Sequence, residues 1–194
     1  MAKPDRKEAP SGPRGRDAVV DAVCKAGAQL FAERGPGAVS SREIAARAGV
    51  NYGLLHRHFG SREALVSAIL TCLSAELGRA MEEGRRSGRS VFATLAEQPA
   101  YARALAYAAL DGFDMATIQD AHPILDRLVP LVSGGAGVDE APLEDRARVA
   151  TASAALLGWA VFGSFLAPAL RIEGAEGERA IEAALGSTRS PAGA

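Results

Sequence analysis

The densest group of side chains suited to non-covalent recognition lies between positions 41 and 62 of the 194-residue chain. Hydroxyl, guanidinium, imidazole and phenol groups recur there every few residues, with a glycine among them. Such groups donate hydrogen bonds or stack, which suits contacts to base edges and phosphate oxygens, and a glycine allows close approach of the backbone. The residues predicted on this basis to contact bases or phosphates are Ser41, Arg42, Tyr52, Gly53, His56 and Arg57.

Two short helices joined by a tight turn must position these side chains. Ser40 and Glu43 form an S-x-x-E pattern that begins a helix, with Val39 placed as its hydrophobic staple. Gly49 ends that helix, and Asn51 is a good N-cap for another over Tyr52–His58. The pair predicts a helix-turn-helix, whose crossing and pinning residues would be Ala45, Ala48, Ile44, Val50, Leu55 and Phe59.

Helical patterns continue on both sides of this unit. A first helix is predicted over Arg16–Arg34, ended by Gly35 and Pro36, and a fourth begins near Arg62 and reaches Arg86. The apolar stripe of the first helix is Val20, Val23, Cys24, Gly27, Leu30 and Phe31. Later helices are predicted over Phe92–Glu97, Ala100–Asp111, Ala116–Val132 (broken or bent around Pro123), Leu143–Leu170 and Glu176–Leu185.

No segment has the alternation typical of strands, so the predicted fold is all-α. It comprises an N-terminal three-helix DNA-binding domain with a helix-turn-helix and a C-terminal helical domain for ligand binding and dimerisation. The predicted divisions are a disordered basic arm over 1–15, the DNA-binding domain over 16–62, the effector-binding and dimerisation domain over 63–186, and a frayed tail over 187–194.

The run from Ser40 to Leu65, SSREIAARAGVNYGLLHRHFGSREAL, resembles the DNA-binding signature of the tetracycline-repressor (TetR) family, and the resemblance extends over about residues 16–70. It implies that Ser41 and Arg42 approach DNA and that His56 replaces the tyrosine usual in the family. Tyr52 also departs from the small or basic residue common there. The implied DNA-binding set is Ser41, Arg42, Asn51, Tyr52, Gly53, Leu54, His56, Arg57, His58 and Arg62, with Tyr52, Gly53 and Leu54 facing the major groove and Arg62 meeting a phosphate.

The position of Arg62 has two interpretations that do not depend on the family resemblance. A cation in the first turn of a helix opposes the helix dipole, so it is either an exposed arginine with a small penalty or the partner of a phosphate bound at that N-terminus. The context of the helix-turn-helix favours the phosphate.

Other chemistry finds little support. His56 and His58 are two residues apart and point to different faces of a helix, so no metal site and no cofactor is predicted. Cys24 and Cys72 lie in apolar helical patterns and are expected to be reduced core residues of a cytoplasmic protein. No P-loop, dinucleotide-binding glycine motif, H-E-x-x-H or G-x-S-x-G is present, so no enzyme activity is predicted.

Charge is distributed unevenly along the chain. Residues 1–62 carry a formal charge of +5 and residues 63–194 carry −6, so the first third is the part expected to meet a polyanion. The arm is either a solvated tail or a DNA contact through Arg14 and Arg16.

Residues 149–170 contain no charged side chain, which is long enough to span a bilayer. Their content of Ala, Gly and Ser instead favours a helix that pairs with its copy in a homodimer. The predicted interface is Leu156, Trp159, Ala160, Gly163, Leu166, Ile181 and Leu185, and the predicted ligand pocket is Tyr101, Tyr107, Phe113, Met115 and Trp159.

These expectations describe a homodimeric, sequence-specific DNA-binding transcription regulator. It would be a repressor released from a palindromic operator on double-stranded DNA by an unidentified small-molecule effector. The alternative is a helical carrier or interaction protein that has lost specific DNA binding.

Overall fold

The computed structural model describes residues 13, 15–118 and 122–186, and within these ranges the chain forms helices without strands. The all-α prediction is therefore confirmed. The helices are α1 Arg16–Arg34, α2 Ser41–Arg47, α3 Tyr52–Phe59, α4 Arg62–Arg86, α5 Val91–Glu97, α6 Ala100–Leu110, α7 Met115–Ile118, α8 Leu125–Val132, α9 Leu143–Ala169 and α10 Gly174–Gly186. Residues 1–12 and Arg14 of the predicted arm, and the predicted tail 187–194, lie outside the described residues.

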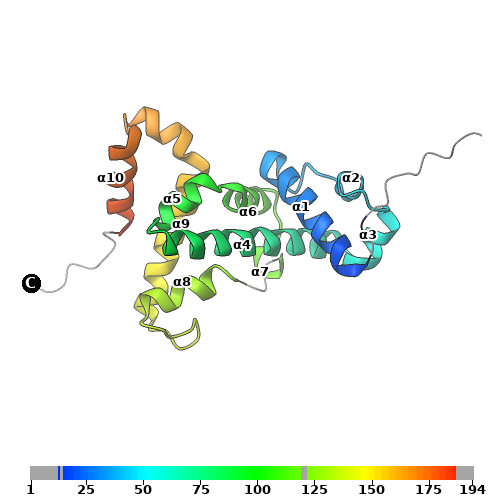
Figure 1. Cartoon of the computed structure of the whole chain (residues 1–194), viewed down its shortest axis with the longest axis horizontal. Coiled ribbons are helices and arrows are strands. Elements are labelled where there is room, and N and C mark those ends of the chain that lie inside the picture. Colours follow the sequence, from blue (N-terminus) through cyan, green and yellow to red (C-terminus); the bar gives the residue numbers. More distant parts are fainter. Residues whose placement is uncertain (1–12, 14, 119–121, 187–194) are drawn as a thin grey trace, which may run out of the picture.

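The molecule is elongated, with its two functional halves at opposite ends of α4 (Figure 1). Helices α1, α2 and α3 gather at one end, and α9 and α10 lie at the other. The α6 helix lies alongside α1 and α4 and also packs against α9. Thus α4 and α6 both connect α1, which packs against the helix-turn-helix, to the rest of the chain.

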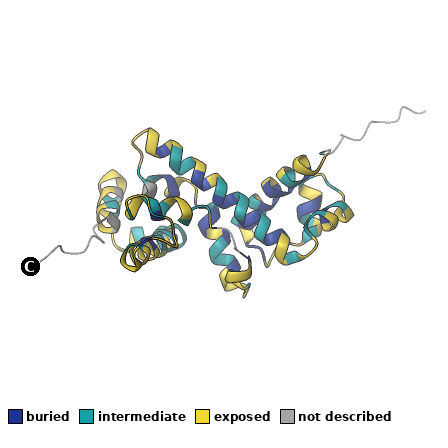
Figure 2. Cartoon of the chain, turned by 90° about the horizontal axis from the view of Figure 1, so that it is seen from below, coloured by how far each residue is buried: buried dark blue, intermediate teal, exposed yellow. Residues whose placement is uncertain are grey.

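A continuous core runs along α1, α4 and α6, as the buried segments in Figure 2 show. Val23, Phe31, Leu65 and Ile69 are fully enclosed in it. The α1 stripe begins at Val19 rather than at the predicted Val20, since Val19 is buried and Val20 only partly so.

The two cysteines correct a prediction. Cys24 of α1 and Cys72 of α4 are joined by a disulfide, with their Cα atoms 6.1 Å apart, and are not the reduced residues expected. Nearby, Gly27 lets α1 and α4 approach closely, because a Cβ built there would lie 2.3 Å from Cδ1 of Ile69. The α1 helix is thereby joined to α4 by both packing and a covalent bond.

The segment predicted as one broken or bent helix over Ala116–Val132 forms two helices, α7 and α8. His122, directly before Pro123, is not helical, and Pro130 is accommodated inside α8. The residue before a proline is disfavoured in helical geometry, which accounts for the break, the first of the two predicted alternatives.

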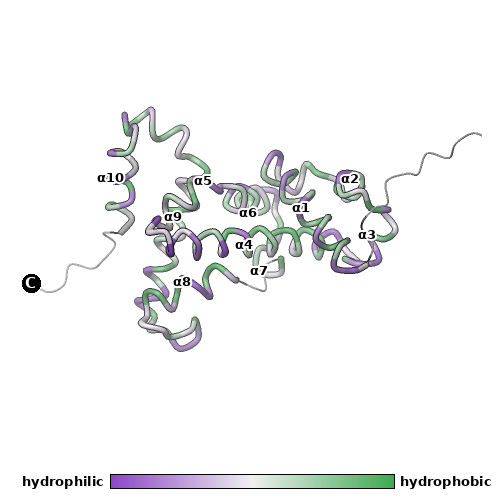
Figure 3. The backbone as a smooth tube through the Cα atoms, viewed as in Figure 1, coloured by the Kyte–Doolittle hydropathy of each residue, from purple (hydrophilic) through white to green (hydrophobic). Residues whose placement is uncertain are grey.

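Two of the described helices, α4 and α9, are long and apolar enough to cross a membrane by length and composition alone. They differ in burial: much of α4 lies in the core, whereas few residues of α9 are fully buried. Figure 3 shows the hydrophobic character of both helices. The α4 helix is thus explained as a core helix, whereas α9 keeps an apolar face that the described residues do not cover.

Candidate DNA-binding interface

The turn between α2 and α3 is built by caps that the sequence specifies. Ser40 Oγ accepts the N–H of Glu43 at 3.2 Å, which starts α2. Asn51 Oδ1 accepts the N–H of Gly53 at 2.7 Å, which starts α3. Gly49 takes φ 66°, the conformation that lets the chain turn between them. The second half of the predicted capping box is absent among the described contacts, because the Glu43 carboxylate pairs with Arg34.

Apolar side chains hold the two helices together as predicted. Ile44, Ala45 and Leu55 are buried, and Val50 and Phe59 pack against the same core. Polar residues consequently remain on the outside. The exposed members of the predicted DNA-binding set are Arg42, Asn51, Tyr52, Gly53, His56 and Arg57, while Ser41 and His58 are partly buried.

Leu54 has a different environment from its neighbours. Its side chain is half-buried and packs against the core of the DNA-binding half. Groove contact by Leu54, like the other individual DNA contacts, stays a prediction.

Arg42 and Tyr52 bring α2 and α3 together on the exposed side. The Arg42 guanidinium lies 5.4 Å from the centre of the Tyr52 ring, within the range of a cation–π contact. Tyr52 is 42% exposed, so the ring holds the arginine and still presents an edge to solvent. A donor from α2 and an aromatic group from α3 therefore form one surface.

Arg62, the first residue of α4, turns toward the loop between α1 and α2. Its Nη2 donates to the carbonyl oxygen of Val39 at 2.6 Å and to that of Pro36. The guanidinium also lies 5.7 Å from the Phe31 ring centre, and burial lowers the pKa of Arg62 from its usual value. Nη1 is buried without a partner among the described residues. The phosphate contact of Arg62 stays a prediction, and its carbonyl contacts are an additional role that the sequence did not indicate.

A cavity lies in the other half of the molecule. It has a volume of about 150 Å³, is partly open, and is lined by α4, α5, α6, α8 and α9 with the segment before α8. Its walls are almost entirely apolar, and Ser153 Oγ is buried there without a partner among the described residues. The lining residues are Leu77, Met81, Leu95, Tyr101, Leu105, His122, Ile124, Leu125, Leu128, Ser153, Leu156 and Leu157.

The five predicted pocket residues are not gathered around this cavity. Tyr101 lines it, whereas Tyr107 and Trp159 border separate hollows, and Phe113 and Met115 pack against the core. Sequence patterns could not separate cavity-lining leucines from ordinary core. Ser153 was the available signal, because it is a hydroxyl in an uncharged apolar run.

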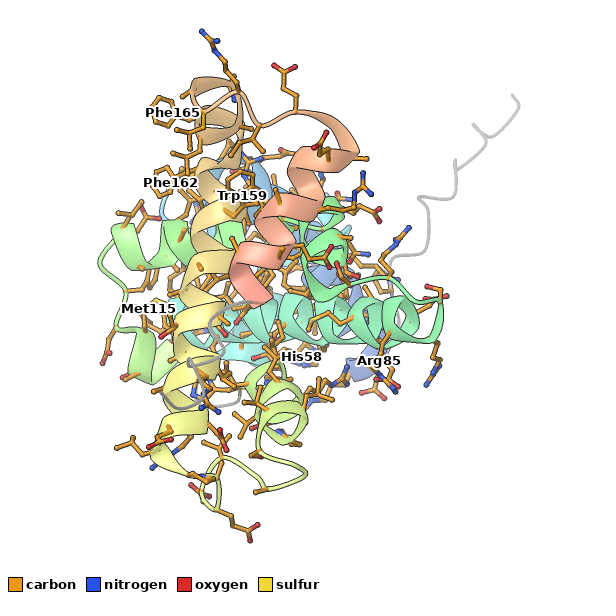
Figure 4. The ribbon with its side chains drawn as sticks, turned by 90° about the vertical axis from the view of Figure 1, so that its left-hand side faces the viewer. His58, Arg85, Met115, Trp159, Phe162 and Phe165 are labelled. Carbon is orange, nitrogen blue, oxygen red and sulfur yellow. A yellow bond between two sulfur atoms is a disulfide. The ribbon has the colours of Figure 1, made fainter. Side chains whose placement is uncertain are left out.

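The outer face of α9 is apolar and uncovered. Phe162 is 59% and Phe165 69% exposed, and Figure 4 shows both rings projecting outward from α9 while Trp159 points toward α10. Of the predicted interface residues, Leu156 and Ala160 pack against the core cluster and Gly163 lies against Trp159. Leu166 and Ile181 are partly buried, and the side chain of Leu185 lies outside the described part of the chain.

The comparisons with known proteins agree with this geometry. Residues 23–69, from within α1 into α4, match the family described as "Bacterial regulatory proteins, tetR family". The HTH-type transcriptional regulator Mb3439c of Mycobacterium bovis is 36% identical over 174 residues, covering 90% of this chain and 87% of that protein. The HTH-type transcriptional repressor Rv3405c of Mycobacterium tuberculosis matches to the same extent.

This likeness spans nearly the full length of both chains and includes the capped α2–α3 pair. The chain therefore belongs to the tetR family of bacterial regulatory proteins and is a DNA-binding, helix-turn-helix regulator of transcription.

Proposed function

We propose that the protein is a cytoplasmic homodimeric repressor that leaves its operator when a small, mainly apolar molecule occupies the cavity between α4 and α9. One observation carries the proposal: the exposed polar surface of α2 and α3 and an apolar cavity lie in opposite halves of one chain, and α4 contributes to both. The repressor role of the Mycobacterium tuberculosis relative supports the direction of regulation.

The uncovered α9 face supports a second copy as its partner. Residues 149–170 have no charge, and the exposed Phe162 and Phe165 form an apolar surface at the end of the molecule far from the helix-turn-helix. Pairing two such faces removes apolar area from water, at about 25 cal/mol per Å². It also leaves both DNA-reading surfaces free. Phe162 and Phe165 therefore join the predicted interface residues. Leu156 lines the cavity and is a weaker candidate for the interface.

A dimer fixes the kind of DNA site. Two recognition helices related by a two-fold axis enter successive major grooves about 34–36 Å apart, which requires a near-palindromic operator. The exposed Arg42 and Tyr52 on α2 and α3 would read bases, and Arg57 and His56 would contact the backbone or neighbouring bases.

The cavity supports an uncharged effector. An apolar cavity of about 150 Å³ can hold a molecule of the size of benzene. Because Ser153 Oγ has no partner among the described residues, a ligand with one hydroxyl or carbonyl group gains a hydrogen bond there. If the ligand binds better to a conformation with misplaced recognition helices, DNA affinity falls by the same coupling free energy.

The test is selection of purified full-length protein on a random double-stranded DNA library. Enrichment of an inverted repeat, bound by two chains per site, supports the dimeric repressor. Recovery of unenriched, salt-sensitive DNA leaves a helical carrier or interaction protein, and extraction of the protein only with detergent identifies α9 as a membrane span.

Effector binding is tested separately by thermal unfolding with phenol and toluene as probes. We expect both to raise the midpoint in proportion to the logarithm of their concentration. Phenol should raise it more than toluene, because its hydroxyl group can bond to Ser153, and this difference should disappear in Ser153→Ala. Leu156→Trp, which fills the cavity, should abolish the shift by either probe. Equal shifts in this filled variant would remove the cavity as the binding site.

A further inference from the structure

The residue that follows α6 reaches the loop between α1 and α2. Asp111 Oδ2 accepts the backbone N–H of Gly37 at 2.7 Å, across 74 positions of sequence. It is a direct contact between the effector half of the chain and the loop that leads into the DNA-reading helices.

Two glycines of the loop are pressed against the end of α6. A Cβ built on Gly35 would lie 2.7 Å from Cβ of Tyr107, and one built on Gly37 would lie 2.5 Å from Cγ of Asp111. Real Cβ atoms do not approach other atoms so closely. Gly35, which has φ 76° and lies against Cβ of Tyr107, therefore requires glycine, whereas a side chain at Gly37 would displace the carboxylate of Asp111. The Asp111 hydrogen bond is thus part of a close-packed contact.

The opposite edge of the same loop is held by α4. Arg62 donates to the carbonyl oxygens of Pro36 and Val39. The next residue, Ser40, caps α2, and α2 carries Ser41 and Arg42. Within five residues, the loop passes from an α6 contact through an α4 contact to the first turn of α2.

We propose that Asp111 is a positioning residue for DNA reading: its bond to Gly37 fixes the loop that sets the direction of α2, and so places Arg42 against the operator. Asp111 itself does not touch DNA. The same α6 helix carries Tyr101 and Leu105 in the cavity wall, so displacement of α6 moves the loop anchor with it. This last link rests on the proposed effector site, while the positioning role rests only on the DNA-binding activity of the family.

The test compares full-length Asp111→Ala and Asp111→Asn on the selected operator and on non-specific DNA. Asp111→Ala should weaken operator binding about fivefold, the loss expected for one net hydrogen bond. Its affinity for non-specific DNA and its salt slope should not change. Asp111→Asn keeps a carbonyl oxygen acceptor and should restore most of the operator affinity.

Asp139→Ala is the matched control, since it removes the same charge from another exposed loop of this half. If the loss of negative charge, and not of the hydrogen bond, changed the DNA affinity, Asp111→Asn would behave as Asp111→Ala and both would bind DNA more tightly. If Asp111 only stabilised the fold, Asp111→Ala would lower the unfolding midpoint while the folded protein kept its operator affinity. Either result overturns the proposal.

A double-mutant cycle gives a second, independent readout. Gly37 is not at a positive φ, so Gly37→Ala acts through the contact of its new Cβ with the Asp111 carboxylate. Gly37→Ala should weaken operator binding in the parent and much less in the Asp111→Ala background. Additive losses would contradict the contact. A parent protein that binds no operator would instead reject the proposed function, so the two failures are distinguishable.

Discussion

The guanidinium of Arg42 lies over the ring of Tyr52, 5.4 Å from its centre, and joins the start of α2 to the start of α3. Arg42 supplies hydrogen-bond donors from α2, and Tyr52 supplies an aromatic ring from α3. Together they fix a donor and an aromatic edge in one orientation, because each restricts the rotamers of the other.

Replacement of Tyr52 should therefore change sequence preference. We expect Tyr52→Ala to alter the bases enriched at one position of each half-site, because Arg42 loses its support, worth about 0.5–1 kcal/mol at an exposed site. Tyr52→Phe keeps the ring and should preserve the preference. Selection of both variants on the same DNA library measures this, and an unchanged motif in Tyr52→Ala would show that the ring does not direct Arg42.

Arg62→Ala separates two roles of one side chain. Loss of the donors to Pro36 and Val39 should lower the free energy of unfolding by about 1–3 kcal/mol, since these carbonyl oxygens lose charged partners. Operator affinity should fall with it. The predicted phosphate contact adds a second signature, a decrease of about one in the slope of log affinity against log salt. Chemical denaturation and salt titration measure the two effects, and Arg57→Ala, on the exposed side of α3, is a comparison for the salt slope alone.

Phe162→Glu and Phe165→Glu should convert the protein to a monomer. A carboxylate in the apolar α9 interface would be buried without a partner, which is strongly unfavourable. Light scattering after gel filtration measures the mass, and operator affinity should fall as the two half-sites lose their linkage. Val138→Glu places the same charge at another exposed apolar residue and should leave the mass of a dimer. A dimeric mass for both α9 variants would contradict this interface.

The Cys24–Cys72 disulfide closes a long loop between α1 and α4, with a sequence separation of 48. Loop-closure entropy predicts that the oxidised protein is more stable than the reduced one by about 4 kcal/mol. Denaturant unfolding with and without a thiol reductant measures this difference. A Cys24→Ala/Cys72→Ala variant should show no response to the reductant, and two titratable thiols in the untreated, unfolded protein would show that the bond is not formed.

Local signals predicted the DNA-binding half well. Gly35 and Pro36 end α1 at Arg34, and Ser61 starts α4 at Arg62, where the sequence placed both boundaries. These signals act within a few residues, so a linear pattern contains them. The contacts of Arg62 with Pro36 and of Asp111 with Gly37 join distant segments, and no local pattern reveals them.

The C-terminal half was harder to predict for the same reason. Tyr101 and Tyr107 lie on one short helix, yet only Tyr101 borders the cavity, because α6 is packed on several sides. The pairing of Cys24 with Cys72 depends on how closely α1 approaches α4. Gly27 permits this close approach, but a glycine in the sequence does not by itself predict it. The sequence places Phe162 and Phe165 in an apolar helix. That their side chains point outward follows only from how α9 packs against its neighbours.

The cap at Asn51 restricts the hydrogen bonds that its side chain could make to a base. Its Oδ1 accepts the N–H of Gly53, which leaves one lone pair of the oxygen and the NH₂ group for other partners. A bidentate contact with adenine needs both the oxygen and the nitrogen of the amide. Such a contact by Asn51 would have to share the oxygen with Gly53 or release the cap of α3, at a cost of about 1 kcal/mol. The hydrogen bond that starts α3 thus acts against bidentate reading of adenine by this residue, while the NH₂ group alone can still donate to an acceptor on adenine, guanine or thymine.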